Sequence, residues 1–114
     1  MEAIHMETKE VLAALAAIAQ ESRLAIFRLL VQIGPDGMAA TKIAEQLDIA
    51  PSSLSFHLKE LTHARLITSR SEGRFVIYAA DVLVMNSLIG YLTENCCGGV
   101  PCGPAGCDTT TTAT

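Results

Sequence analysis

The sequence lacks the long apolar run that a membrane-spanning helix requires. Such a helix takes about 20 consecutive apolar residues, and polar or charged side chains at residues 20–23 and at Arg28 interrupt the apolar region between residues 11 and 33. The N-terminus carries Glu2, Glu7 and Glu10 and lacks the basic segment that opens a secretory signal peptide. We therefore expect a cytosolic protein with no membrane partner, in which the four cysteines are reduced.

Positive charge is also scarce, because 8 lysines and arginines stand against 12 carboxylates, for a net charge of −4. This balance argues against indiscriminate binding to nucleic acid. Between residues 41 and 78, however, five lysines and arginines outnumber four carboxylates. Nucleic-acid binding is therefore allowed through a focused basic patch, and it should be sensitive to salt.

The sequence shows no catalytic pattern of nucleophile, base and orienting residue around His5, His57 or His63. We therefore predict that the protein is not an enzyme, although its cysteines leave a thiol enzyme or metalloid carrier as an alternative. The 114 residues suit one domain. A hydrophobic content of 50% is generous for a small monomer and indicates a surface for a partner chain.

Residues 51–78 predict a helix followed by a β-hairpin. Leu54, Leu58 and Leu61 recur at i, i+4 and i+7, so they form one buried stripe of a helix over residues 51–64. Two runs rich in β-branched and aromatic residues follow at 66–70 and 74–78, with residues 71–73 as the turn. A helix with a polar outer face and a hairpin beside it are typical of a winged helix-turn-helix.

Amphipathic patterns predict four more helices, at residues 8–20, 22–33, 41–48 and 82–95, with Ser22 and Asp81 as N-caps. The predicted fold is mainly α with a β-hairpin wing (α+β), in the order α-α-α-α-β-β-α. Apolar first and last helices predict a homodimer. Residues 1–95 would form the DNA-binding and dimerisation domain, and residues 96–114 a cysteine-bearing segment with a disordered tail.

Several spaced motifs resemble those of ArsR-type (ArsR/SmtB) metalloregulatory repressors. Residues 51–61, PSSLSFHLKEL, resemble the S-x-S-x-H-L-K-x-L core of that family; residues 64–67 and 72–78 resemble its hairpin, and residues 22–30 its second helix. The resemblance covers about residues 15–78. It implies a homodimeric repressor of operator DNA that a metal or metalloid releases. Arg65 stands where the family usually has glycine, so we expect a strained left-handed residue there.

The candidate DNA contacts are polar, aromatic and cationic side chains of the predicted recognition helix, the helix before it and the hairpin. They are Ser52, Ser53, Ser55, Phe56, His57, Lys59, Lys42, Arg70 and Arg74. A structural hydrogen bond is an equal alternative for His57, and a structural ion pair is favoured over a phosphate contact for Arg23. A winged-helix protein-interaction module with a solvated outer helix face is the alternative function.

All four cysteines fall within the twelve residues 96–107, among glycines and prolines that form turns. We expect Cys96, Cys97 and Cys102 to converge as a trithiolate on As(III) or Sb(III), with Cys107 as a further candidate. A four-sulfur zinc site, a disulfide-based redox switch and inert cysteines are the alternatives.

The resemblance bears on this site. Many arsenic-responsive members of the family carry a Cys-Val-Cys pair that residues 37–41 lack, and the last predicted helix lacks the histidines of the family's zinc site. Some arsenic repressors instead carry a Cys-Cys pair and a later cysteine after the last helix, which Cys96, Cys97 and Cys102 resemble. A site of two cysteines would favour methylarsenite as the inducer.

Overall fold

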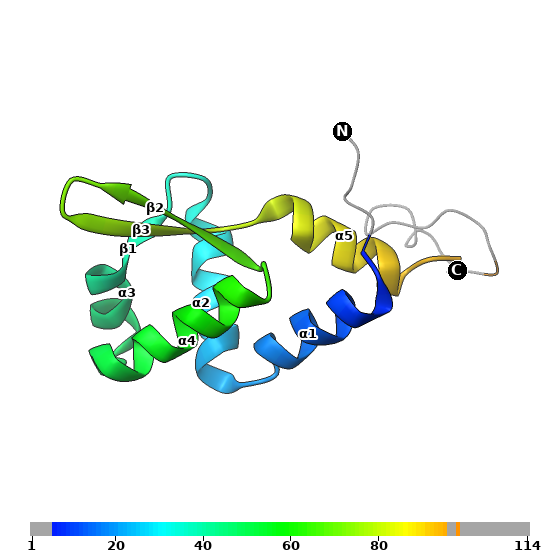
Figure 1. The fold of residues 1–114 in the computed structure, drawn as a ribbon, viewed down its shortest axis with the longest axis horizontal. Coiled ribbons are helices and arrows are strands. Elements are labelled where there is room, and N and C mark those ends of the chain that lie inside the picture. Colours follow the sequence, from blue (N-terminus) through cyan, green and yellow to red (C-terminus); the bar gives the residue numbers. More distant parts are fainter. Residues whose placement is uncertain (1–5, 96–97, 99–114) are drawn as a thin grey trace, which may run out of the picture.

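The computed structural model describes residues 6–95 and Gly98. It contains, in chain order, α1 (Thr8–Ile18), α2 (Glu21–Ile33), β1 (Met38–Ala39), α3 (Ala40–Leu47), α4 (Pro51–His63), β2 (Ile67–Glu72), β3 (Phe75–Ala80) and α5 (Val82–Leu92) (Figure 1). The predicted order of four helices, a hairpin and a last helix is confirmed. One short strand, β1, is additional.

Two helices begin after an N-cap residue whose side chain accepts a hydrogen bond from one of the first backbone N–H groups of the helix. The side chain of Gln20 accepts the backbone N–H of Arg23 at 2.9 Å, so Gln20 is the N-cap of α2. The prediction of Ser22 as this N-cap was wrong. Asp81 is the N-cap of α5, as predicted, because its carboxylate accepts the backbone N–H of Val84 at 3.2 Å. Helix α5 ends at Leu92, short of the predicted end at residue 95.

The three strands form one antiparallel sheet in the order β1-β3-β2. Glu72 pairs with Phe75, which leaves Gly73 and Arg74 as a two-residue turn, and Gly73 has the positive φ of 64° that such turns use. The prediction of the turn at residues 71–73 was therefore wrong: the turn begins two residues later and ends one residue later, because Ser71 and Glu72 belong to β2. Figure 1 shows the hairpin extending beside α3 at the end of the molecule opposite α5.

The core lies between α2, α3, α4 and the base of the hairpin. Its largest fully buried side chains are Ile26, Leu30, Ile43, Leu61, Leu66 and Ile67. The predicted stripe of α4 is confirmed, since Leu54, Leu58 and Leu61 are all buried. Burial of this stripe turns the opposite face of α4 to solvent, and that face carries most of the candidate DNA contacts.

The end of α4 requires a residue in the left-handed conformation. Arg65 has φ 68°, as expected, and its guanidinium lies 3.2 Å from a carboxylate oxygen of Glu10 in α1. A left-handed non-glycine residue costs roughly 1–2 kcal/mol. The strain is the cost of turning the chain from α4 directly into β2.

Several apolar side chains of α1 and α5 are not covered. Leu12 is 61% exposed on α1, and Leu92 and Val82 are 57% and 51% exposed on α5. A Cβ atom added at Gly90 of α5 would meet no atom of another described element within 4 Å, so no other described helix or strand approaches α5 closely at this position. None of the described helices is long and apolar enough to cross a membrane.

Candidate nucleic-acid interface

Helices α3 and α4 form a helix-turn-helix through the three residues 48–50. Asp48 adopts a left-handed conformation with φ 54°, and the backbone N–H of Ile49 donates to the carbonyl of Ala44 at 3.0 Å. Pro51 then starts α4 at the position where the missing N–H has no intrahelical partner. This tight turn holds the N-terminal half of α4 at the surface.

The structure places five of the predicted contacts on exposed positions of α4. These are Ser52, Ser53, Ser55, Phe56 and Lys59. The Phe56 ring is 56% exposed and meets the His57 ring edge-on, with ring centroids 5.8 Å apart. A large ring held at the surface of an otherwise polar helix face is available to an apolar group such as a thymine methyl.

His57 lies at the flank of α4 and contacts Arg23 of α2. Arg23 Nη1 is 3.4 Å from His57 Nδ1, and Arg23 Nε donates to the carbonyl of Ala17 at 2.6 Å. Because arginine can only donate, Nδ1 of His57 must accept in this contact. The pair links the end of α1 to the recognition helix, so the structural alternative for His57 and a structural role for Arg23 are both present in the fold.

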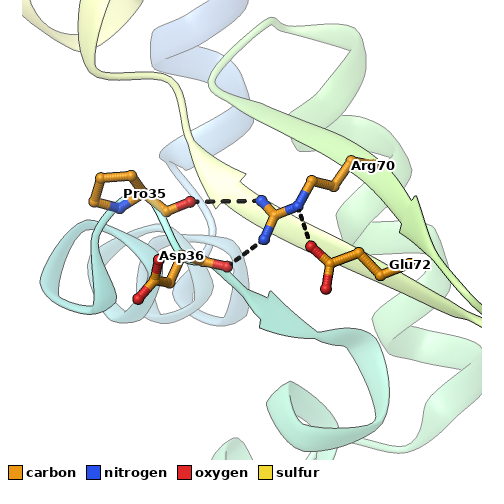
Figure 2. A network of polar contacts seen from close by, with 4 residues as sticks. All are labelled: Pro35, Asp36, Arg70 and Glu72. Carbon is orange, nitrogen blue, oxygen red and sulfur yellow. Dashed lines mark hydrogen bonds and ion pairs between the residues drawn. The ribbon is translucent and has the colours of Figure 1, made fainter.

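Each of the three guanidinium nitrogens of Arg70 in β2 contacts an oxygen atom within the protein (Figure 2). Its Nε donates to Glu72 at 2.7 Å, its Nη2 donates to the carbonyl of Asp36 at 2.7 Å, and its Nη1 is 3.5 Å from the carbonyl of Pro35. Asp36 and Pro35 belong to the loop before β1. The geometry therefore gives Arg70 the role of an anchor that joins the hairpin to this loop.

The other predicted cations are less engaged. Arg74 lies in the turn of the hairpin and forms no ion pair with any residue that the structure describes. Lys42 of α3 is 3.9 Å from Glu45, but both side chains are more than two thirds exposed, so solvent weakens this pair. Both cations remain available to an external anion.

An open groove of about 450 Å³ separates α4 from the hairpin. It is lined by Ser55, Lys59, Thr62, His63, Ser69 and Tyr78. Ser69 and Tyr78 are direct partners across β2 and β3. Sequence reasoning did not select them, because only the register and packing of the hairpin bring them opposite α4.

The predicted metalloid ligands Cys96, Cys97, Cys102 and Cys107 lie outside the described residues, as does nearly all of the predicted segment 96–114. In residues 6–95, no three histidine, cysteine or acidic side chains are grouped so that they would hold a metal ion.

The helix pair, the exposed face of α4 and the adjoining hairpin define a winged helix-turn-helix protein. A helix-turn-helix domain model matches residues 18–70. The chain is 34% identical over 76 residues to the transcriptional repressor SdpR of Bacillus subtilis, a match that covers 67% of this chain and 81% of SdpR. The chain belongs to the ArsR family of winged helix-turn-helix proteins, whose members are transcriptional regulators and not enzymes.

Other comparisons agree with this family. A protein of Halobacterium salinarum named as the arsenical resistance operon repressor ArsR is 34% identical over 64 residues, 56% of this chain, and the chain spans about half (49%) of that relative. The structure of an ArsR-like regulator from Rhodococcus matches with a TM-score of 0.68 at 26% identity, covering 75% of this chain and 78% of the other. A homodimeric winged helix-turn-helix domain from Mycobacterium bovis matches with a TM-score of 0.61 at 27% identity, covering 76% and 81%.

Proposed function

We propose that this protein is a metalloid-responsive repressor that binds operator DNA as a dimer and releases it when As(III) or Sb(III) binds the C-terminal cysteines. The DNA-binding part of this proposal rests on one observation, the exposed face of α4 beside an anchored hairpin. Hydroxyl groups, an ammonium group and an aromatic ring on one helix suit contacts to base edges and phosphates. The named repressors among the relatives support repression as the outcome of binding.

The uncovered apolar side chains of α1 and α5 support the dimer. Leu12, Val82 and Leu92 are each more than half exposed, and the two helices contact one another. Burial of such a face is worth about 25 cal/mol per Å². A two-fold dimer through α1 and α5 would carry two copies of α4 onto one palindromic site. The homodimeric relative from Mycobacterium bovis supports this assembly.

The inducer part of the proposal rests on the cysteines that follow α5. In the sequence, Cys96 and Cys97 come directly after Asn95, which lies three residues beyond the end of α5, and Cys102 follows the sequence Gly-Gly-Val-Pro. Three thiolates suit a thiophilic metalloid, whereas two would favour methylarsenite. A ligand bound by these cysteines would be held close in sequence to the end of α5, one of the proposed dimer helices. A coupling free energy of about 1–3 kcal/mol between the two sites would change operator affinity some 5- to 150-fold.

The test is fluorescence anisotropy of the reduced full-length protein on its own upstream promoter DNA, with As(III), Sb(III), methylarsenite or Zn(II) added separately. Release near stoichiometric As(III) or Sb(III), with Zn(II) inert, is the expected result. Release by methylarsenite alone would indicate that the site consists of only two cysteines. Release by Zn(II) alone would replace the inducer with zinc, and release only by oxidants would replace it with a redox signal. Absence of binding to duplex DNA would refute the proposal that the protein is a repressor.

Two variants separate sensing from DNA binding. Cys96→Ser and Cys97→Ser should bind the promoter as tightly as the wild type and should not release it with As(III). Cys107→Ser tests the further candidate ligand: full release by As(III) would leave the site to Cys96, Cys97 and Cys102, whereas loss of release would add Cys107 to it. If the Cys96 and Cys97 variants lost promoter binding without any inducer, these cysteines would be structural and the sensing proposal would fail.

A further inference from the structure

The groove between α4 and the hairpin has the chemistry of an anion site. Its lining contributes four hydroxyl groups, the ammonium group of Lys59 and the imidazole of His63, and no carboxylate. Lys59 has no ion-pair partner within residues 6–95. The Thr62 hydroxyl already donates to the carbonyl of Leu58 at 2.7 Å, so its proton is used within α4 and Thr62 only contributes to the wall of the groove. Lys59, His63, Ser55, Ser69 and Tyr78 are left to meet a ligand.

Two observations show that the hairpin side of the groove is held in place. Tyr78 is half-buried against the core, and its strand, β3, is the central one of the sheet, paired with β1 at Met38 and with β2 at Ser69. Ser69 directly precedes Arg70, whose guanidinium joins β2 to the loop before β1 (Figure 2). The two hairpin hydroxyls therefore lie on a rigid support, and little conformational freedom is lost when they bind.

The position of the groove identifies the anion. When a recognition helix reads the major groove and the hairpin reaches the adjacent minor groove, the sugar–phosphate strand that separates the two grooves must pass between helix and hairpin. In this protein the strand would cross the groove between α4 and β2. We propose that this groove binds one backbone phosphodiester of each operator half-site. Lys59 supplies the charge, and the hydroxyls of Ser69 and Tyr78 donate hydrogen bonds.

This inference rests on the proposed DNA binding and refines it. Lys59 becomes a phosphate contact instead of a base contact. Ser52 and Phe56, nearer the start of α4, are left to face the bases. Phosphate contacts position a protein on the duplex without reading its sequence. Substitutions in the groove should therefore weaken binding to every duplex alike, whereas substitutions of base-reading residues should change the preference for the operator.

The first test measures affinity for the operator and for a scrambled duplex at several salt concentrations. Lys59→Gln should weaken both by the same factor and lower the slope of log affinity against log salt by about 0.9 for each protomer. Tyr78→Phe keeps the packed ring and removes one donor, so it should weaken both duplexes several-fold without changing the slope. Lys9→Gln, an equal change of charge on α1, is the control and should change neither quantity.

The second test replaces single operator phosphates with neutral methylphosphonates. One position in each half-site, between the major-groove contact and the hairpin contact, should reduce wild-type affinity and have little further effect on Lys59→Gln. Independent effects at every position would overturn the inference, as would a change of the operator-to-scrambled ratio in Lys59→Gln. In either case the wild type still binds its operator, so the result differs from failure of the repressor proposal, in which the wild type binds no duplex.

Discussion

The hairpin carries two arginines, Arg70 in β2 and Arg74 in the turn, and the structure predicts that their removal affects different properties of the protein. Arg70 donates to Glu72 and to the loop carbonyls of Asp36 and Pro35, whereas Arg74 has no ion-pair partner in the part of the chain that the structure describes. Arg70→Gln should therefore lower the free energy of unfolding, and Arg74→Gln should lower only the affinity for DNA. The two variants change the net charge equally.

The size of the Arg70 effect follows from its three contacts. The Glu72 ion pair is partly exposed (44% and 57%), so solvent limits it to about 0.5 kcal/mol. The 2.7 Å bond to the Asp36 carbonyl is exposed, so solvent weakens it, and it should contribute about 1–1.5 kcal/mol. The 3.5 Å contact to Pro35 adds little. We expect Arg70→Gln to lower the free energy of unfolding by about 1–2 kcal/mol in total.

Urea unfolding at one fixed protein concentration measures this loss, because dimer stability depends on concentration. With a urea dependence of about 2 kcal/mol per molar, the middle of the range for small proteins, the midpoint of Arg70→Gln should fall by roughly 0.5–1 M. Its salt slope for DNA binding should stay near that of the wild type. The free energy of unfolding of Arg74→Gln should lie within about 0.5 kcal/mol of the wild-type value. Its slope of log DNA affinity against log salt should fall by about 0.9 for each protomer.

The opposite pattern would refute this reasoning. If Arg70→Gln unfolded at the wild-type urea concentration and lost salt slope as Arg74→Gln does, Arg70 would be a phosphate contact and not an anchor. The original sequence-based prediction for Arg70 would then hold.

Three further variants test separate parts of the structure. Gly37→Ala should lower the free energy of unfolding in urea by about 2–4 kcal/mol, because φ is +72° and the new Cβ would lie 2.5 Å from the carbonyl oxygen of Tyr78; an unchanged midpoint would contradict this geometry. Asp81→Ala removes the N-cap of α5 and should cost about 1 kcal/mol in the same assay, whereas a neutral result would show that the bond to Val84 contributes nothing. Leu12→Glu should halve the mass measured by light scattering, and a dimer of undiminished stability would place the interface elsewhere.

Local periodicity was enough to predict the helices and the polar face of α4. Leu54, Leu58 and Leu61 recur at a spacing that only a helix brings to one side, so their burial follows from sequence order alone. Arg65 was predicted to be left-handed because it stands where the family has glycine, and it is left-handed, because the chain turns within the three residues 64–66 between α4 and β2. The cysteine cluster and its proposed ligands also come from the sequence alone.

Contacts between distant segments decided the rest. Strand β1 is only two residues long and exists because Met38 and Ala39 pair with Tyr78 and Ile77, about forty residues away. The sequence treats Arg70 and Arg74 alike, since each is a cation beside a turn. Only the fold brings the loop at Pro35 and Asp36 to Arg70 and leaves Arg74 in the turn.

The helix and hairpin faces of the groove likewise come from separate elements. Periodicity orients Ser55 and Lys59 on α4, but Ser69 and Tyr78 become their neighbours only when the hairpin packs beside that helix. Sequence order therefore determined which residues share a helix face, because that depends on dihedral angles close along the chain. Tertiary structure determined which faces meet, because that depends on burial and pairing between segments far apart.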